Sequence, residues 1–351
     1  MRERWSTLVI LAAVILGVAA VGAVSGAVIQ RVATDMLIKI VVVIGLSIFT
    51  GNSGILSFGH VSFAAIGAYG SAWFTLPLTM KKIFLPKLPY FILTTHVTMP
   101  TGAVIGMAFA SIFAAIVGVV IMRLSGIAAS IATLAWLAIV NNVLANADSL
   151  TRGTSSLIGL PLVTNVGNAA VGALLSLAAA FIFKYSPYGL MLQASREDEV
   201  AAAAAGIAVR WLRLVAFVLS AAIVAMGGVL QGHFLGMLSV GQFYFEFTFL
   251  TLAMLVIGGM RSLSGAVIGT IVVSTLAEAL RTLAAGFTIG WLTVPAAAGV
   301  REIGLAAIML AVLLIRPNGI MGDRELHLGE GRKARSEARV AVASNARKSL
   351  T

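Results

Sequence analysis

Long apolar runs, separated by short polar interruptions, make up most of this chain. Each run can cross a bilayer as a helix, because lipid leaves unpaired backbone groups without partners and so favours helices. Ten such runs lie at about 8–29, 36–50, 61–76, 101–121, 127–147, 166–183, 214–234, 247–260, 265–283 and 303–315. This pattern predicts an all-α integral membrane protein, a polytopic helical bundle of about ten transmembrane helices with both termini on one side.

Both ends of the chain are basic. Arg2 and Arg4 precede the first apolar run, which is longer than the core of a signal peptide (about 7–15 residues), so we expect a retained span rather than a cleaved leader. Residues 321–351 form a basic tail of low apolar content, which we expect to be mobile. The chain therefore divides into a transmembrane domain at 1–320 and a cytoplasmic tail at 321–351.

The composition excludes a soluble domain. Hydrophobic residues make up 60% of the chain and charged residues 11%, with a mean hydropathy of +1.03, whereas soluble proteins carry about 25% charged residues. No cysteine is present, which excludes disulfides and thiolate chemistry. The net charge of +11 does not require nucleic acid, because membrane proteins retain Lys and Arg on the cytoplasmic side. This rule places both termini in the cytoplasm, although the loop with Lys81, Lys82 and Lys87 runs against it.

One interior segment, residues 186–213, cannot lie in hydrocarbon. It carries an unbroken charged block, and burying each such charge at a bilayer centre costs roughly 3 kcal/mol. The members of this block are Arg196, Glu197, Asp198 and Glu199. The segment is therefore either a solvated loop between two spans or a docking element for a soluble partner.

Local signals in the same segment predict a short helix-turn-helix. Ser186 can cap a helix, and Pro187 suits a first helical turn. The alanine run at 201–205, which includes Ala203, favours helix. Gly206 permits a turn before a second helix restarts at Val209.

A second interruption, at 51–60, is rich in glycine and serine and reads GNSGILSFGH. Unwound backbone at membrane depth is tolerated only where it is buried in protein or lines a cavity, and broken helices mark substrate sites in many transporters. A turn at the membrane surface is the alternative. If the interruption forms a solute path, the candidate residues are Ser53, Ser57, Gly59, His60, Phe63 and Tyr69. His60 either contacts solute or makes a structural hydrogen bond that fixes the helix break.

The chemistry of an enzyme is missing from the sequence. No carboxylates are spaced for general acid–base catalysis, and the four histidines show no metal-ligand spacing, so we expect neither a metal nor a cofactor. No lysine follows a glycine, which excludes the phosphate loop GxxxxGK[ST]. If transport is driven by ATP, another subunit hydrolyses it.

Four ordered stretches resemble one known family. They are GNSGILSFGHVSFAAIGAYGSA at 51–72, TRGTSSLIGLP at 151–161, the region from SPYGLMLQASREDEVAAAAAGIAVRWLR onward at 186–230, and LVIGGMRSLSGAVIG at 255–269. Together they resemble branched-chain amino acid ABC transporter permeases of the LivM type, over about residues 7–320. The chain departs from the usual pattern at Val61, Ser62 and the stretch 154–157, which leaves the cargo open between amino acids and urea or amides.

The resemblance implies a permease subunit in the bacterial inner membrane. Its implied partners are a second permease subunit, two cytoplasmic ATP-binding subunits, a periplasmic solute-binding protein, an amino-acid substrate and membrane lipid. Segment 186–213 would be the coupling region that docks on an ATPase, through Arg196, Glu197, Asp198, Glu199, Ala203 and Gly206. A stand-alone secondary transporter or channel, and a membrane scaffold without transport, are the alternatives.

Overall fold

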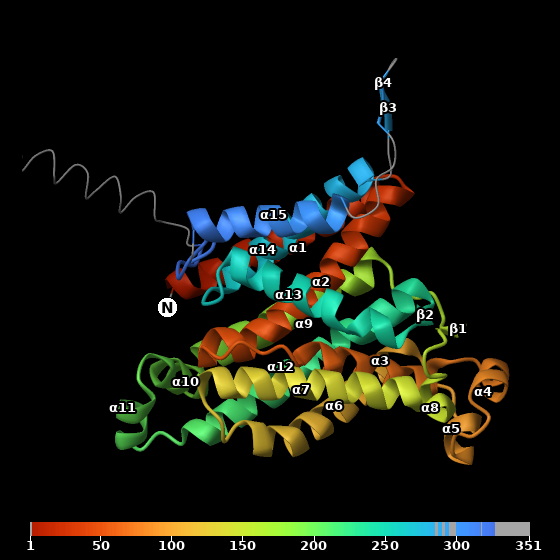
Figure 1. Cartoon of the computed structure of the whole chain (residues 1–351), viewed down its shortest axis with the longest axis horizontal. Helices are drawn as coiled ribbons and strands as arrows, with labels where there is room; N and C mark the ends of the chain where they lie inside the picture. The colour runs from red at the N-terminus through yellow and green to blue at the C-terminus, as the bar shows by residue number, and fades with distance from the viewer. Residues whose placement is uncertain (1, 285–286, 290–291, 295–299, 317, 327–351) are drawn as a thin grey trace, which may run out of the picture.

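The computed structural model describes residues 2–284, 287–289, 292–294, 300–316 and 318–326 (Figure 1). The prediction of an all-α membrane protein is confirmed. Among the described residues, eight helices are long and apolar enough to cross a membrane, or nine if α3 and α4 count as one bent span. The last predicted span corresponds to α15, which has 16 residues.

Every predicted apolar run contains a long helix. These helices are α1 (Arg2–Val24), α2 (Ala27–Ser53), α3 (His60–Thr75), α6 (Met99–Ile121), α7 (Gly126–Asn146), α9 (Val166–Tyr185), α12 (Val209–Leu235), α13 (Phe245–Gly258), α14 (Leu263–Ala284) and α15 (Val300–Ile315). Short elements connect them: α4 (Leu78–Phe84), α5 (Tyr90–Thr94), α8 (Asp148–Thr151), α10 (Pro187–Glu197), α11 (Glu199–Ala204) and the 3-10 helix η1 (Val240–Phe243). Two antiparallel strand pairs complete the description, β1 (Leu157–Ile158) with β2 (Met237–Leu238) and β3 (Phe287–Ile289) with β4 (Leu292–Val294).

Helices α2 and α12 lie at the centre of the bundle, and small residues let their neighbours approach closely. A Cβ on Gly228 of α12 would stand 2.1 Å from the carbonyl oxygen of Ala64 in α3. A Cβ on Gly106 of α6 would stand 2.4 Å from the carbonyl oxygen of Gly67. Such contacts bring helix backbones together where lipid provides no hydrophobic driving force between helices.

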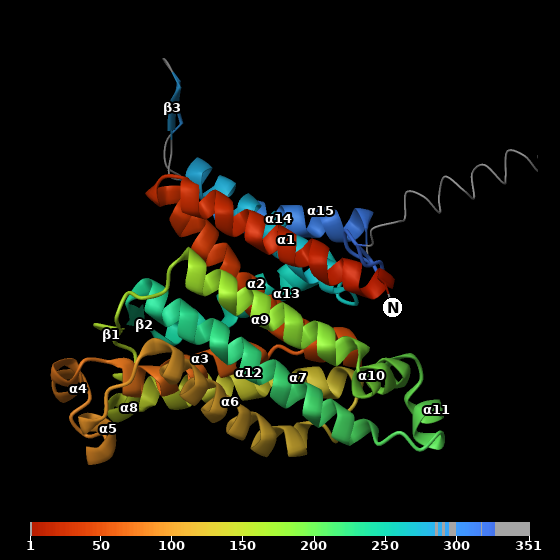
Figure 2. The ribbon, with the colours of Figure 1, turned by 180° about the vertical axis from the view of Figure 1, so that it is seen from behind.

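The short elements gather at the two ends of the bundle. Figures 1 and 2 show α4, α5, α8 and the β1–β2 pair at one end, and α10 and α11 at the other. The start of the chain lies at the same end as α10. The first residues of the predicted tail lie there too, because Glu325 contacts Lys184 at the end of α9. Residues 327–351 of that tail lie outside the described residues.

The interruption between α2 and α3 is shorter than predicted. The sequence placed it at 51–60, but α2 continues through Ser53 and α3 begins at His60. Gly54 ends α2 in the left-handed conformation, with φ +74°, and its N–H donates to the carbonyl of Thr50. Residues 51–53 stay helical because they are buried against the rest of the bundle, so glycine alone does not unwind them.

Candidate functional site

The predicted helix-turn-helix exists at one end of the bundle. Ser186 caps α10, since its Oγ accepts a hydrogen bond from the N–H of Gly189 at 3.1 Å, and Pro187 occupies the first helical turn. Gly206 has φ +83°, and α12 begins at Val209, as the sequence predicted. These three signals were local, which is why they could be read from the sequence.

A second turn, between α10 and α11, was not predicted. Asp198 leaves the helical conformation, and its Oδ1 accepts hydrogen bonds from the N–H groups of Val200 and Ala201, both at 2.9 Å. One acid of the charged block therefore caps α11. The block is divided between two helices.

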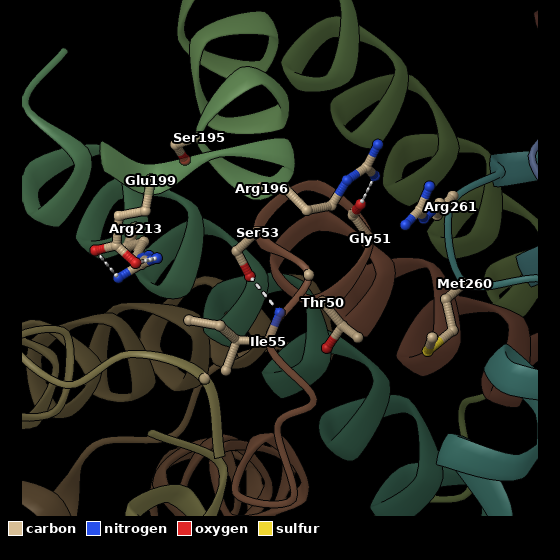
Figure 3. A pocket seen from close by; sticks show the side chains of 12 residues that line it. Thr50, Gly51, Ser53, Ile55, Ser195, Arg196, Glu199, Arg213, Met260 and Arg261 are labelled. Carbon is tan, nitrogen blue, oxygen red and sulfur yellow. Dashed lines mark hydrogen bonds and ion pairs between the residues drawn. The ribbon is translucent and has the colours of Figure 1, made fainter. Parts of the chain in front are cut away.

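Arg196 ties α10 to the end of α2 (Figure 3). Its Nη1 donates to the carbonyl of Gly51 at 2.7 Å, and its Nη2 lies 2.8 Å from Oε1 of the neighbouring Glu197. The arginine side chain covers Gly54, where an added Cβ would stand 2.6 Å from Arg196 Cγ. Glycine is thus required at position 54 for two reasons. Its φ is positive, and a Cβ there would collide with the Arg196 side chain.

Glu199 ties α11 to α12 and α7. Its Oε2 lies 2.8 Å from Nη2 of Arg213, and its Oε1 accepts hydrogen bonds from Arg213 Nη1 and Ser125 Oγ, both at 3.1 Å. The Arg213 side chain is only 4% exposed. The hydrogen bonds from Arg213 lower the pKa of Glu199, because they favour the ionised carboxylate. Figure 3 shows this pair on one side of a pocket.

A third connection joins α9, α14 and the segment after α15. The buried carboxylate of Glu325 accepts hydrogen bonds from the backbone N–H groups of Leu263 and Ser264, at 2.8 and 2.9 Å, and so caps α14. Lys184, at the end of α9, donates to Glu325 and to the carbonyl of Arg261. Burial alone would raise the pKa of Glu325, but the charge of Lys184 and these hydrogen bonds outweigh it and lower the pKa overall.

The remaining carboxylate of the block also pairs within the chain. Glu197 lies 3.7 Å from Nη1 of Arg261, which in turn lies 3.3 Å from Oδ2 of Asp323. The hydrogen bond and the charge of Arg196 lower the pKa of Glu197. Glu197 is 61% exposed, so water screens these pairs.

A polar pocket of about 330 Å³ lies between these connections (Figure 3). Its walls come from the end of α2, the start of α7, α10 to α12 and the loop before α14. Ser53, Arg196 and Glu199 line it, together with Thr50, whose buried hydroxyl has no hydrogen-bond partner within the described residues. The arrangement is a polar cleft at the end of the bundle, bordered by the contacts of Arg196 and Glu199, which join α2, α7, α10, α11 and α12.

The structure divides the predicted solute-path residues among different places. Ser53 lines the polar pocket, whereas Gly59 packs against α7, with an added Cβ only 2.5 Å from the carbonyl of Thr133. Tyr69 borders a separate apolar cavity of about 270 Å³ between α3, α6 and α7. The six residues therefore do not surround one common cavity.

His60 lies inside an aromatic cluster rather than on a cavity wall. It is 1% exposed, its Nδ1 lies 2.6 Å from Ser57 Oγ, and its ring is 5.0–6.1 Å from the rings of Phe49, Phe63 and Phe217. Its Nε2 has no hydrogen-bond partner within the described residues. This geometry suits the structural alternative, in which His60 fixes the helix break.

Sequence reasoning missed the residues that hold the charged block in place. Arg213 lies 14 positions from Glu199, and Glu325 lies 141 positions from Lys184. Neither spacing is the three or four residues at which side chains meet on one helix, so no local pattern pairs them. Within the described part of the chain, no cluster of three or more His, Asp or Glu could hold a metal ion.

The fold and the site define a polytopic helical membrane protein with two short helices packed across one end of its bundle. The sequence profile described as "Branched-chain amino acid transport system / permease component" matches residues 28–315. The chain therefore belongs to this family of permeases, and the resemblance drawn from its four motifs is confirmed.

Individual relatives carry the same description. LivM of Escherichia coli K12, a "high-affinity branched-chain amino acid transport system permease protein", is 28% identical, with 71% of this chain and 63% of that protein covered. A LivH protein of Methanocaldococcus jannaschii is 27% identical, covering 81% of this chain and 88% of that protein. LivH of Escherichia coli K12 is 32% identical, covering 43% of this chain and 44% of that protein.

The match to LivM is partial, since the chain spans 63% of the length of that relative. Among solved structures, a chain of a metal-chelate type ABC transporter in an inward-facing conformation covers 90% of this chain and 100% of that chain, at 14% identity. The TM-score of this superposition is 0.44.

Proposed function

We propose that this chain is the permease subunit of an ATP-driven importer that carries branched-chain amino acids across the bacterial inner membrane. Its partners are a second permease subunit, two cytoplasmic ATP-binding subunits and a periplasmic solute-binding protein. ATP is hydrolysed on the partner subunits. The end of the bundle that carries α10 and α11 faces the cytoplasm, with both termini.

One observation carries the proposal. Two short helices lie beyond the spans, present an exposed apolar surface, and are tied into the bundle by buried or half-buried charges. The exposed side chains are Tyr188, Leu190, Met191 and Val200, with Val200 80% exposed. Such a surface suits a protein partner, because apolar anchors supply most of the binding energy at interfaces.

The contacts of Arg196, Glu199 and Lys184 explain how a movement of an ATPase is transmitted to the transmembrane helices. Arg196 connects the docking surface to α2, and the Glu199–Arg213 pair connects it to α12 and, through Ser125, to α7. Lys184, three residues before the start of α10, connects it to α14 through the Glu325 carboxylate. A displacement of α10 and α11 therefore acts on four spans at once.

The break between α2 and α3 contributes to the solute path in two ways. Ser53 faces the polar pocket, where its hydroxyl can meet the carboxylate or ammonium of an amino acid. His60, Ser57 and Gly59 hold the break in position against α7 and α12. Tyr69 provides an apolar wall deeper in the bundle, and Phe63 packs behind the break in the aromatic cluster around His60.

Reconstitution tests this function. The chain is assembled in proteoliposomes with its second permease and two ATP-binding subunits, and the binding protein is supplied with labelled leucine, phenylalanine or urea. We expect leucine uptake that requires ATP and all subunits. Uptake by the chain alone would favour a channel or secondary transporter, uptake of urea would assign an amide cargo, and assembly without uptake of any solute would favour a scaffold.

A further inference from the structure

The segment between α3 and α6 turns across the end of the bundle opposite to α10 and α11 (Figures 1 and 2). Helix α4 makes an angle of 118° with α3, so it does not continue the span. Helix α5 follows after a short turn and leads back into α6. A segment that joins two spans in this way lies at the level where hydrocarbon gives way to water.

A buried lysine gives this segment a fixed shape. Lys81 is 0% exposed, and its Nζ donates to the carbonyls of Phe74, Ile92 and Thr95 at 3.3, 3.1 and 2.5 Å. An ammonium group has three N–H donors, so these three acceptors satisfy it completely. The bonds join the end of α3, α4 and α5 into one folded unit. Lys81 therefore serves the fold and is not a charge displayed to the solvent.

The outer surface of this unit combines apolar, aromatic and cationic groups. Ile83, Tyr90 and Phe91 are 66%, 82% and 62% exposed, and Lys82 and Lys87 of the same segment are exposed as well. The stretch 77–100 contains no acidic residue. Aromatic rings and lysines are the side chains enriched where protein meets the headgroup region, and anionic headgroups complement the positive charge of Lys82 and Lys87.

We propose that α4 and α5 form an interfacial anchor, which seats Ile83, Tyr90 and Phe91 in the headgroup–acyl boundary and places Lys82 and Lys87 against anionic lipid headgroups. The bilayer is the fitting partner because both neighbouring spans enter it at this level. Removing three large apolar side chains from water supplies the attraction, and the lysines add a component that depends on lipid charge. The anchor also accounts for the lysines that run against the positive-inside pattern.

Spin labelling tests this anchor directly, because the chain has no cysteine and one introduced cysteine gives one labelled site. The full chain carrying Phe91→Cys is placed in nanodiscs of phosphatidylcholine and phosphatidylglycerol. Collision of the label with oxygen, which partitions into lipid, is compared with collision with a water-soluble nickel complex. Ser155→Cys, in an exposed loop near β1, is the water-facing control, and Ile112→Cys, exposed on α6, is the lipid-facing control.

We expect an oxygen-to-nickel ratio at Phe91 several-fold above that at Ser155 and close to that at Ile112. A ratio equal to that at Ser155 would overturn the proposal. Protection of the label only after the binding protein is added would also overturn it, since the surface would then belong to a soluble partner.

The lysines are tested in the Phe91→Cys background. With Lys82 and Lys87 present, nickel access to the label should fall as the share of phosphatidylglycerol rises. In the variant with Lys82→Gln and Lys87→Gln this dependence on lipid charge should disappear. Both lysines are exposed, so the fold should persist. An unchanged dependence in the double variant would remove headgroup recognition from the proposal.

Discussion

Replacing Glu199 by glutamine would leave the guanidinium of Arg213 buried without its counter-charge. In the native chain both carboxylate oxygens face Arg213, and Ser125 donates to one of them. Glutamine keeps the size of the side chain and one acceptor, so the perturbation is mainly electrostatic. Helix α11 has only six residues, too few to be stable as an isolated helix, so its position depends on contacts such as this ion pair.

The size of the free-energy loss in Glu199→Gln follows from the exposure of Glu199 and Arg213. Breaking a fully buried ion pair costs roughly 3–5 kcal/mol, but Glu199 is 41% exposed while Arg213 is 4% exposed, so solvent reduces the loss. We expect about 2 kcal/mol, the range of a hydrogen bond to a charged group. That free energy corresponds to a roughly thirtyfold shift toward a detached α11.

Hydrogen exchange and uptake measure the consequence. In Glu199→Gln we expect faster amide exchange at 199–204 and a loss of ATP-driven uptake, while the spans exchange as before. Glu197→Gln is the matched control, because Glu197 is 61% exposed and pairs with no fully buried cation. It should therefore affect exchange less than Glu199→Gln. Native exchange in α11 together with native uptake in Glu199→Gln would show that the Glu199–Arg213 pair does not hold α11 in place.

Because α11 is held by the Glu199–Arg213 pair, its protection from exchange should depend on pH. The pKa of Glu199 is lowered from its usual 4.5 in the folded chain. A carboxyl whose folded pKa is depressed contributes stability above its unfolded pKa, and that contribution disappears as the pH falls through the folded value. Protection of α11 should therefore hold from neutral pH down to about 4.5 and then decline, whereas Glu199→Gln should show no decline in this window.

The remaining predictions concern three other positions. His60→Asn should lower the yield of assembled complex, because it breaks the bond to Ser57, while leucine preference in competition assays stays unchanged; an altered preference would instead place His60 in contact with solute. Gly206→Val should reduce ATP-driven uptake more than Gly206→Asn, because φ +83° costs a branched residue about 1–2 kcal/mol and asparagine less; equal losses would contradict this. Glu325→Gln should lower the thermal unfolding midpoint of the detergent-solubilised chain, because Lys184 loses its counter-charge; an unchanged midpoint would show that the tie adds no stability.

The helices could be predicted from the sequence because lipid imposes them. Any long apolar run must satisfy its own backbone, so all ten runs contain helices. The turn at Gly206 and the cap at Ser186 were equally accessible, since each depends on neighbours within four residues. Asp198 was harder to interpret, because an acid among acids looks like part of a charged surface until its hydrogen bonds are known.

The partners of the charged block could not be predicted. Glu199 and Arg213 meet only because α11 folds back toward α12, and Glu325 reaches Lys184 only because the segment after α15 returns to α14. Both pairs depend on how the helices pack, and packing follows shape complementarity among many small residues rather than any single motif. The sequence therefore located the helix-turn-helix but not the bonds that hold it in place.

Contact between α11 and an ATP-binding subunit is the central claim, and one cross-linking measurement tests it most directly. Val200→Cys, at an 80% exposed position, is reacted in the full complex with a reagent that joins its thiol to nearby lysines. Tyr90→Cys, 82% exposed at the opposite end of the bundle, is the control. We expect a cross-link from Val200 to an ATP-binding subunit and none from Tyr90 to that subunit. Absence of that cross-link from Val200, in a complex that hydrolyses ATP and transports solute, would contradict it.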